Sequence, residues 1–228
     1  MTIFNFALKR SLGGKLDIFM LLLLPVVTVF ISVETWLPIP FGFQLYGLLL
    51  LFMASKICKI MMIDRESRVV LRIQASPISH LRYLSENLLA YTLILTVINA
   101  VVVGLGVIYY GSGLLEPVKL FIIFNVFSVT SIGISIAWYA LFHHTESAYS
   151  ILSGLFMAMA MLGGMFWPYD IMPEVVQRVI QILPTYWYSV GLRQILLEGG
   201  GGNLYFTLGV LLLFGFAFIL LGSRRRLS

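Results

Sequence analysis

Charged residues are scarce in this chain. Of its 228 residues, 11% are charged and 60% are hydrophobic, and its mean hydropathy is +0.97. A typical soluble domain is about half apolar and about a quarter charged. Because a chain of this size cannot bury so much apolar surface in its own interior, the composition excludes a soluble protein and indicates one whose solvent is lipid.

Cysteine is almost absent, and so are the motifs of nucleotide binding. The single cysteine, Cys58, cannot form a disulfide within the chain, and a structural role is expected for it. No P-loop occurs, since Gly13-Gly14-Lys15 lacks the upstream glycine of G-x-x-x-x-G-K-[ST]. We therefore expect the chain to bind no ATP and to carry no cofactor of its own.

Acids and histidines are missing from the middle of the apolar runs. Asp17 and Glu86 lie at predicted membrane edges, whereas a proton relay needs ionisable groups inside the membrane. His143 and His144 are adjacent and point apart on a helix, while helical zinc sites use histidines four residues apart. The sequence thus predicts no metal site and no catalytic residue.

Long apolar runs, by contrast, fill the chain. A helix that crosses a bilayer needs about 20 apolar residues, and such stretches occur at 17–37, 41–58, 87–110, 118–142, 147–167 and 203–222. They predict an all-α integral membrane fold of six transmembrane helices, in one domain covering residues 1–228. The first run lacks a small-residue cleavage site, so we expect it to be retained as a span.

Lysine and arginine are distributed unevenly along these runs. All but Lys119, Arg178 and Arg193 of the 15 lie before the first span, between the second and third, or after the sixth. Positive residues gather in cytoplasmic segments, so both termini are expected in the cytoplasm. The pI of 9.4 then reports orientation in the membrane, and no nucleic-acid partner is expected because no soluble basic face is present.

Three segments outside the spans have amphipathic patterns. Residues 1–15 predict a helix on the inner leaflet, or alternatively a frayed basic leader. The inner loop from Lys59 to Glu86 predicts a short amphipathic helix and then a second helix with Ser76 as N-cap and Pro77 in its first turn; the alternative is a solvated connector. The outer segment 167–203 predicts two short, half-inserted helices that flank Pro184.

Small and soft residues mark the fourth and fifth spans. Gly133 with Ala137, and Ser150 with Gly154 and Ala158, have the spacing that lets helices approach closely in lipid. The fifth span also carries Met157, Met161 and Met165, which could line a pathway for greasy ligands or serve in ordinary packing.

Two segments together resemble the ABC-2 family of ATP-driven export permeases. Asp64-Arg65-Glu66, followed by Ser76-Pro77-Ile78-Ser79, resembles the family's cytoplasmic loop between spans 2 and 3. Gly164-Met165-Phe166-Trp167-Pro168, followed by Leu183-Pro184, is similar to its fifth span and outer re-entrant helices. Both lie at the right places on a chain with six predicted spans, so together they are more specific than either alone.

The resemblance implies a multi-pass permease subunit of the cell (inner or plasma) membrane, without enzymatic activity of its own. A second permease chain, identical or related, would pair with it, and a cytoplasmic ABC ATPase holding ATP and Mg would drive it. The loop that couples to the ATPase would include Asp64, Arg65, Glu66, Val70, Leu71, Ile73, Ser76, Pro77 and Ile78. The outer gate would include Phe166, Trp167, Pro168, Pro184 and Tyr186.

The nature of the substrate is left open between several classes. Short outer loops favour export of amphiphilic drugs, antimicrobial peptides or lipid-like molecules over export of a polysaccharide or other glycoconjugate. An intramembrane enzyme acting on lipid would need its histidines or acids inside the membrane, and they lie at the edges. A secondary carrier would show a repeat between its two halves, and no convincing repeat is found.

Overall fold

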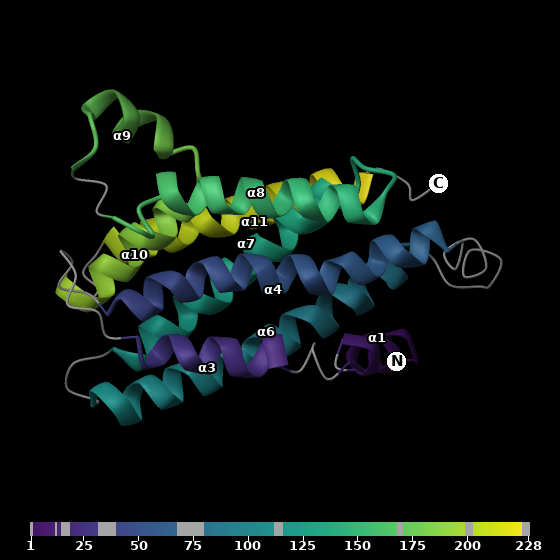
Figure 1. The fold of residues 1–228 in the computed structure, drawn as a ribbon, viewed down its shortest axis with the longest axis horizontal. Coiled ribbons are helices and arrows are strands. Elements are labelled where there is room, and N and C mark those ends of the chain that lie inside the picture. The colour runs from purple at the N-terminus through teal and green to yellow at the C-terminus, as the bar shows by residue number, and fades with distance from the viewer. Residues whose placement is uncertain are drawn as a thin grey trace.

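The computed structural model describes residues 2–11, 13–14, 19–31, 40–67, 80–111, 116–167, 171–198 and 203–224. Within these ranges every regular secondary-structure element is a helix, and the helices form an elongated bundle (Figure 1). In chain order they are α1 (Thr2–Ser11), the π-helix η1 (Phe19–Leu23), α3 (Leu24–Val29), α4 (Phe41–Glu66), α6 (His80–Tyr110), α7 (Pro117–Tyr139), α8 (Thr145–Leu162), α9 (Glu174–Ile180), α10 (Pro184–Glu198) and α11 (Asn203–Arg224).

Four of these helices, α4, α6, α7 and α11, are long and apolar enough to cross a membrane. They coincide with the second, third, fourth and sixth predicted spans, so the all-helical membrane fold is confirmed. Helix α4 continues to Glu66, beyond the predicted span 41–58, and α6 begins at His80, in the segment where the sequence predicts a second inner-loop helix that leads into the third span. Beyond its apolar run, α4 is held in helical form by polar contacts with the neighbouring helices, which hydropathy alone does not register.

The other two predicted spans are helical over shorter stretches. Predicted span 17–37 contains η1 and α3, and predicted span 147–167 contains most of α8, which has 18 residues. Both lie alongside the long helices in Figure 1. A count of six membrane crossings therefore stays a prediction, and so does the placement of both termini in the cytoplasm.

The tightest packing joins α7 to α11 through small residues. Gly133 of α7 faces the backbone carbonyl of Gly215, and Gly215 in turn lies against the backbone of Thr130. The Thr130 hydroxyl donates a hydrogen bond of 2.8 Å to the carbonyl of Leu211. In lipid no hydrophobic driving force brings helices together, so they associate through close packing of this kind. The packing role predicted for Gly133 is thus confirmed.

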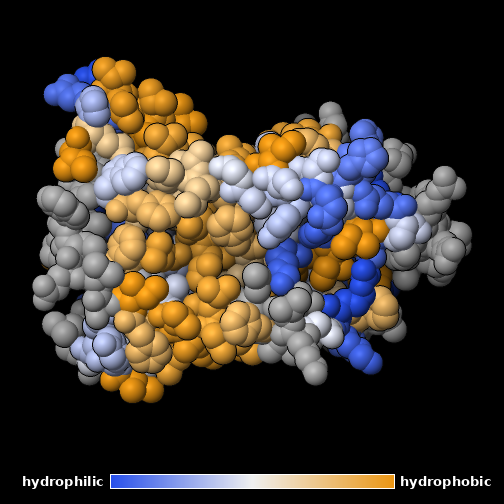
Figure 2. Space-filling model, in the orientation of Figure 1, coloured by the Kyte–Doolittle hydropathy of each residue, from blue (hydrophilic) through white to orange (hydrophobic). Residues whose placement is uncertain are grey.

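Polar and apolar residues divide the surface of the bundle along its length. Figure 2 shows hydrophilic side chains gathered at one end and a broad hydrophobic band over most of the rest of this face, with a smaller hydrophilic group at the outer tip of α9. We call the hydrophilic end the basic end; its described cations are Lys9, Arg10, Lys56, Lys59, Arg65 and Arg82. Helix α1 lies there, and its apolar residues Ile3, Phe4 and Leu8 pack on the protein core. Part of the apolar side of α1 thus covers protein, and its place on the inner leaflet stays a prediction.

The opposite end carries α9 and α10, which behave differently from each other. Helix α10 is sunk among α4, α7, α8 and α11, and Tyr188, Leu192 and Ile195 are buried in the core. Helix α9 projects from the bundle (Figure 1) and leaves Val175 and Val179 exposed, at 75% and 61%. Two short helices do occur where they were predicted. Their depth in the bilayer stays a prediction.

Candidate functional site

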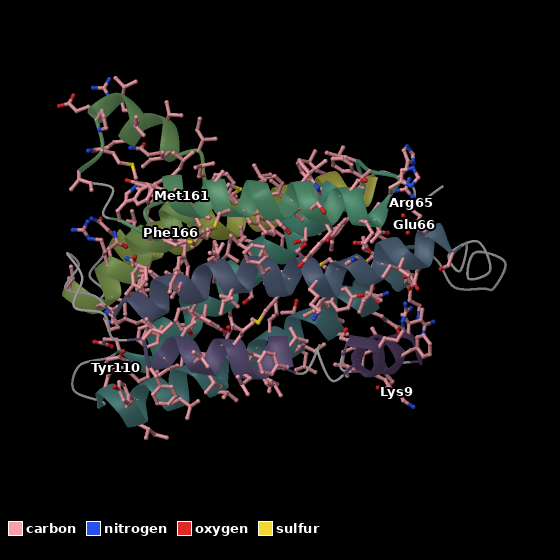
Figure 3. The ribbon with its side chains drawn as sticks, viewed as in Figure 1. Lys9, Arg65, Glu66, Tyr110, Met161 and Phe166 are labelled. Atoms are coloured by element: carbon pink, nitrogen blue, oxygen red, sulfur yellow. The ribbon has the colours of Figure 1, made fainter. Side chains whose placement is uncertain are left out.

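The end of α4 is the best-connected part of the basic end. Its last residues, Asp64, Arg65 and Glu66, directly precede the predicted coupling loop. Asp64 is 5% exposed and lies among α1, α4 and α6. Figure 3 shows Arg65 and Glu66 together at the tip of the bundle, on the side of α8. We call these three residues the α4 hub.

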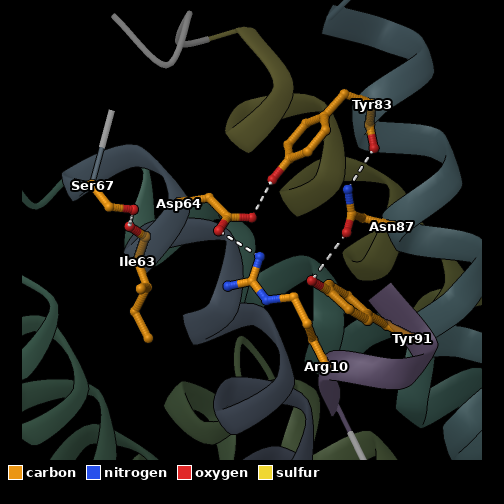
Figure 4. Close-up of polar contacts among 7 residues, drawn as sticks. All are labelled: Arg10, Ile63, Asp64, Ser67, Tyr83, Asn87 and Tyr91. Atoms are coloured by element: carbon orange, nitrogen blue, oxygen red, sulfur yellow. Dashed lines mark hydrogen bonds and ion pairs between the residues drawn. The ribbon is translucent and has the colours of Figure 1, made fainter. Parts of the chain in front are cut away.

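Asp64 joins α4 to two helices at once (Figure 4). Its Oδ1 accepts a hydrogen bond of 2.6 Å from Nη1 of Arg10 in α1, and its Oδ2 accepts one of 3.0 Å from the Tyr83 hydroxyl in α6. In α6 the polar contacts continue inward, because the Asn87 amide donates to the carbonyl of Tyr83 and the Tyr91 hydroxyl donates to Asn87. A carboxylate buried this way is stabilised only while its partners stay in place.

Arg65 and Glu66 join α4 to the turn between α7 and α8. Nη1 of Arg65 donates to the carbonyl of Phe142 at 3.2 Å, and its Nη2 lies 3.5 Å from Nδ1 of His143. A carboxylate oxygen of Glu66 accepts the backbone N–H of Thr145 at 2.6 Å. Thr145 is the first residue of α8, where free N–H groups and the helix dipole favour a negative charge. The α4 hub therefore contacts α1, α6 and the start of α8.

Two further ion pairs reinforce this end of the molecule. Lys59 of α4 pairs with Glu146 of α8 at 2.8 Å, and its ammonium lies over the ring of Tyr149. Glu86 of α6 pairs with Arg82 at 2.9 Å and also accepts the backbone N–H of Phe4 in α1. These contacts join α1, α4, α6 and α8 to one another at the basic end.

All six of the remaining predicted coupling residues fall in one segment of the chain, between α4 and α6. Val70, Leu71, Ile73, Ser76, Pro77 and Ile78 lie outside the described residues, so their contact with an ATPase stays a prediction. The Asp64 side chain points into the bundle, toward α1 and α6. A direct contact between its carboxylate and a partner would require the bonds to Arg10 and Tyr83 to break.

At the opposite end, the predicted gate residues occupy separate positions. The rings of Phe166 and Trp167 lie 6.4 Å apart between α8 and α9. Tyr186, in the first turn of α10, lies edge-on to Trp187. Pro184 begins α10 and is buried, and Pro168 lies outside the described residues. The gate residues therefore surround the junction of α8 with α10 without forming one cluster.

A buried tyrosine, absent from the predicted gate, anchors α10 in the bundle. Tyr188 donates a hydrogen bond of 2.6 Å to the carbonyl of Phe43 in α4, and its ring packs 4.4 Å from that of Phe127. The ring also sits directly against Gly47, where a side chain would collide with it. A Gly on the buried face of a long helix was the available signal, since such a residue often permits close approach of a neighbour.

An apolar groove of about 500 Å³ runs along α7. It is bordered by residues of α8 and α11 and by residues 182–184. Its walls are formed entirely by apolar or aromatic residues, namely Ile134, Ala137, Trp138, Ala140, Leu141, Leu155, Met159, Ile182, Leu183, Pro184, Phe218 and Leu221. The indole N–H of Trp138 is already bonded to the carbonyl of Ala148. Greasy molecules are the ligands that such a groove suits.

The three methionines predicted to line a pathway are not brought together by the fold. Met157 and Met161 are exposed on the outer face of α8, at 44% and 39%, while Met165 is fully buried in the core. Met159, on the other side of α8, is the methionine that borders the groove. The helical register of α8 explains the difference, because residues two apart point to opposite sides.

Comparison with known proteins agrees with this architecture. Residues 32–224 match the family described as ABC-2 family transporter protein. The chain belongs to that family. Its members are multi-pass membrane proteins that act in transport, in general together with a separate ATPase subunit.

Two relatives come from Bacillus subtilis (strain 168). The linearmycin resistance permease protein LnrN is 29% identical over 84 residues, which are 37% of this chain and 22% of LnrN. YvfS, whose name describes it as a transport permease, is 29% identical over 104 residues, or 46% of this chain and 40% of YvfS. The matched segments thus span less than half of either relative.

Proposed function

We propose that this chain is the membrane subunit of an exporter that moves amphiphilic drugs, antimicrobial peptides or lipid-like molecules out of the cell. A separate cytoplasmic ATPase supplies the energy. The observation that carries this proposal is the α4 hub, in which three consecutive residues next to the predicted coupling loop contact α1, α6 and the start of α8. Force applied to that loop reaches three other helices through short polar contacts.

The chemistry of the bundle supports an amphiphilic substrate. The groove beside α7 is apolar throughout. Several polar side chains of the core satisfy one another: Tyr46 donates to Asn99, Asn99 donates to Ser128, and Thr96 donates to Asn125. They are therefore engaged in holding helices together, and the groove is the surface better suited to a substrate. LnrN, whose name refers to resistance to linearmycin, is a relative in keeping with this substrate class.

A second permease chain fits the outer face of α8. Ser150, Gly154 and Ala158 form a line of small residues there, and all three are exposed. No atom of a neighbouring described residue lies within 4 Å of the position that a Cβ of Gly154 would take. A helix of a second copy, or of a related chain, could approach closely at this line, and paired chains would enclose a pathway that one short bundle does not.

Transport by the reconstituted pair tests this function. The tagged chain would be purified from its native host with the ATPase that accompanies it, and both would be placed in proteoliposomes. We expect ATP-dependent movement of a fluorescent amphiphile, and none with a hydrolysis-deficient ATPase as control. Conversion of lipid by the chain alone, or movement only of a glycoconjugate, would contradict the proposal.

We further propose that the outer end gates this pathway through Phe166 and Trp167. Both rings stand where α8 ends, next to the buried start of α10. Replacing both with Ala should raise basal ATPase activity and reduce drug protection in cells, because a leaky gate no longer links ATP hydrolysis to export. ATPase activity in vitro and drug survival would be measured. Parental values for both would show that these aromatics only anchor the chain at the membrane surface.

A further inference from the structure

A cavity of about 260 Å³ lies at the basic end, between α1, η1 and α4. It has no part in the groove beside α7 or in the proposed gate. Its lining consists of a polar side and an apolar side: Arg10, Ser11, Lys56 and Lys59 form the first, and Leu21, Ile57, Ile60 and Ile63 form the second. We call it the α1–α4 pocket.

Three cations form the polar side of the pocket. Arg10 uses one of its nitrogens on Asp64, and a guanidinium has five N–H donors. Lys59 is paired with Glu146, but the side chain of that glutamate is 84% exposed, so water and salt weaken the pair. Lys56 makes contacts of its own and adds a third positive charge to the wall. An incoming anion can therefore bind while the pair between Arg10 and Asp64 stays intact.

A buried hydroxyl on the same side has no partner among the described residues. Ser11 is 3% exposed, and its Oγ makes no hydrogen bond with any described residue. A buried polar atom without a partner is costly unless a ligand or water completes it. The hydroxyl can donate to an anion held by the neighbouring cations, which makes it an independent indication of a ligand.

We infer that the α1–α4 pocket binds the phosphate group of an anionic phospholipid. The cations and the Ser11 hydroxyl would hold the phosphate, and the apolar side would contact the first part of the acyl chains. A free phosphate ion has no apolar part that could contact the four aliphatic residues on one side of the site, whereas the acyl chains of a lipid can pack against them. Basic pockets between helices at this level of a membrane suit such headgroups. The inference does not depend on what the chain transports.

Lipid binding to the purified full chain tests this inference. The probe is phosphatidylglycerol, with phosphatidylcholine as the zwitterionic comparison, and bound lipid is counted by native mass spectrometry from a mild detergent. Neutralising one membrane-facing lysine should lower the affinity about fivefold. Lys56→Gln and Lys59→Gln should each show this loss, and Ser11→Ala a smaller one. Lys9→Gln is the matched control, since exposed Lys9 of α1 does not line the pocket.

A second comparison separates lipid binding from simple structural damage. Lys59→Gln and Glu146→Gln both break the pair between α4 and α8, but only the first removes a donor from the pocket. The inference predicts that the two variants differ, with weaker phosphatidylglycerol binding in Lys59→Gln and unchanged or tighter binding in Glu146→Gln. Equal losses in both variants, or equal loss in Lys9→Gln, would overturn it. Displacement of the lipid by inorganic phosphate alone would also overturn it, because the site would then serve a free anion.

Discussion

At the scale of single residues, Asp64 should contribute more to the stability of the basic end than its place in a run of charged residues indicates. Asp64→Asn keeps the size of the side chain but leaves Arg10 without its counter-ion. A hydrogen bond to a charged group contributes about 1.5–3 kcal/mol, and we expect a loss of this order, seen as a lower midpoint of thermal unfolding in detergent. Tyr83→Phe removes only the second bond to the carboxylate and should cost less.

Lys9→Gln is again the control for Asp64, because it removes a charge from the exposed side of α1. Its unfolding midpoint should match that of the parent. If Asp64→Asn were as stable as this control, the ion pair between Arg10 and Asp64 would contribute nothing to stability. The assignment of the α4 hub as a link to α1 would then be wrong.

Gly47 tests the anchoring of α10 in the same way. Gly47→Ala places a methyl group where the Tyr188 ring lies, and overpacking of this kind costs about 1–3 kcal/mol. Gly104→Ala is the matched control, since open space surrounds that position on α6 and Ala is favoured over Gly in a helix by about 1 kcal/mol. We expect the two variants to shift the thermal midpoint in opposite directions. Equal midpoints would contradict the close contact.

At the scale of helices, hydropathy located the elements but not their partners. The long apolar runs correspond to α4, α6, α7 and α11, because lipid leaves a spanning segment little choice but a helix. The extension of α4 to Glu66 was missed, since Asp64 and Lys59 hold that end of the helix through contacts with distant residues. Such contacts depend on tertiary structure and cannot be seen in a window of sequence.

The candidate site was predictable in part for a related reason. Asp64 lies three and seven residues after the buried Met61 and Ile57, which places a carboxylate on the buried face of α4. Tyr83, Asn87 and Tyr91 recur every fourth residue, which predicts one polar stripe on α6. These two patterns point to a buried polar contact at the basic end. Neither shows that Arg10, 54 residues away, completes it.

The exposed face of α8 makes a prediction about assembly. Ser150→Cys should form disulfide-linked pairs in native membranes under mild oxidation, since the proposed second chain packs on this face. Cys58 is buried and should not react. Leu89→Cys on the exposed side of α6 is the control, because that residue is 63% exposed but lies on another helix. Dimer bands of equal strength for both variants would reflect random collision and contradict the assignment of α8.

At the scale of the whole molecule, the basic and gate ends are linked by α8. Its first residue is bonded to Glu66, and near its other end the carbonyl of Met159 accepts the hydroxyl of Thr185 in α10 at 2.7 Å. A rigid helix held at both ends transmits a displacement over its length. In the proposed exporter, the docking of an ATPase on the loop after Glu66 would thus reach the outer gate through α8.

This arrangement predicts that docking and transmission can be separated by mutation. Leu71→Asp, on the predicted docking face, should abolish both ATPase co-purification and export. Glu66→Gln should leave co-purification unchanged but lower export about two- to fivefold, because the loss of a charge at a helix N-terminus costs about 0.3–1 kcal/mol. Ser67→Ala is the control, since among the described residues the Ser67 hydroxyl is bonded to the carbonyl of Ile63 in the last turn of α4 and to no other helix. If Glu66→Gln lost the ATPase as completely as Leu71→Asp, Glu66 would belong to the docking surface, and the path through α8 would have no support.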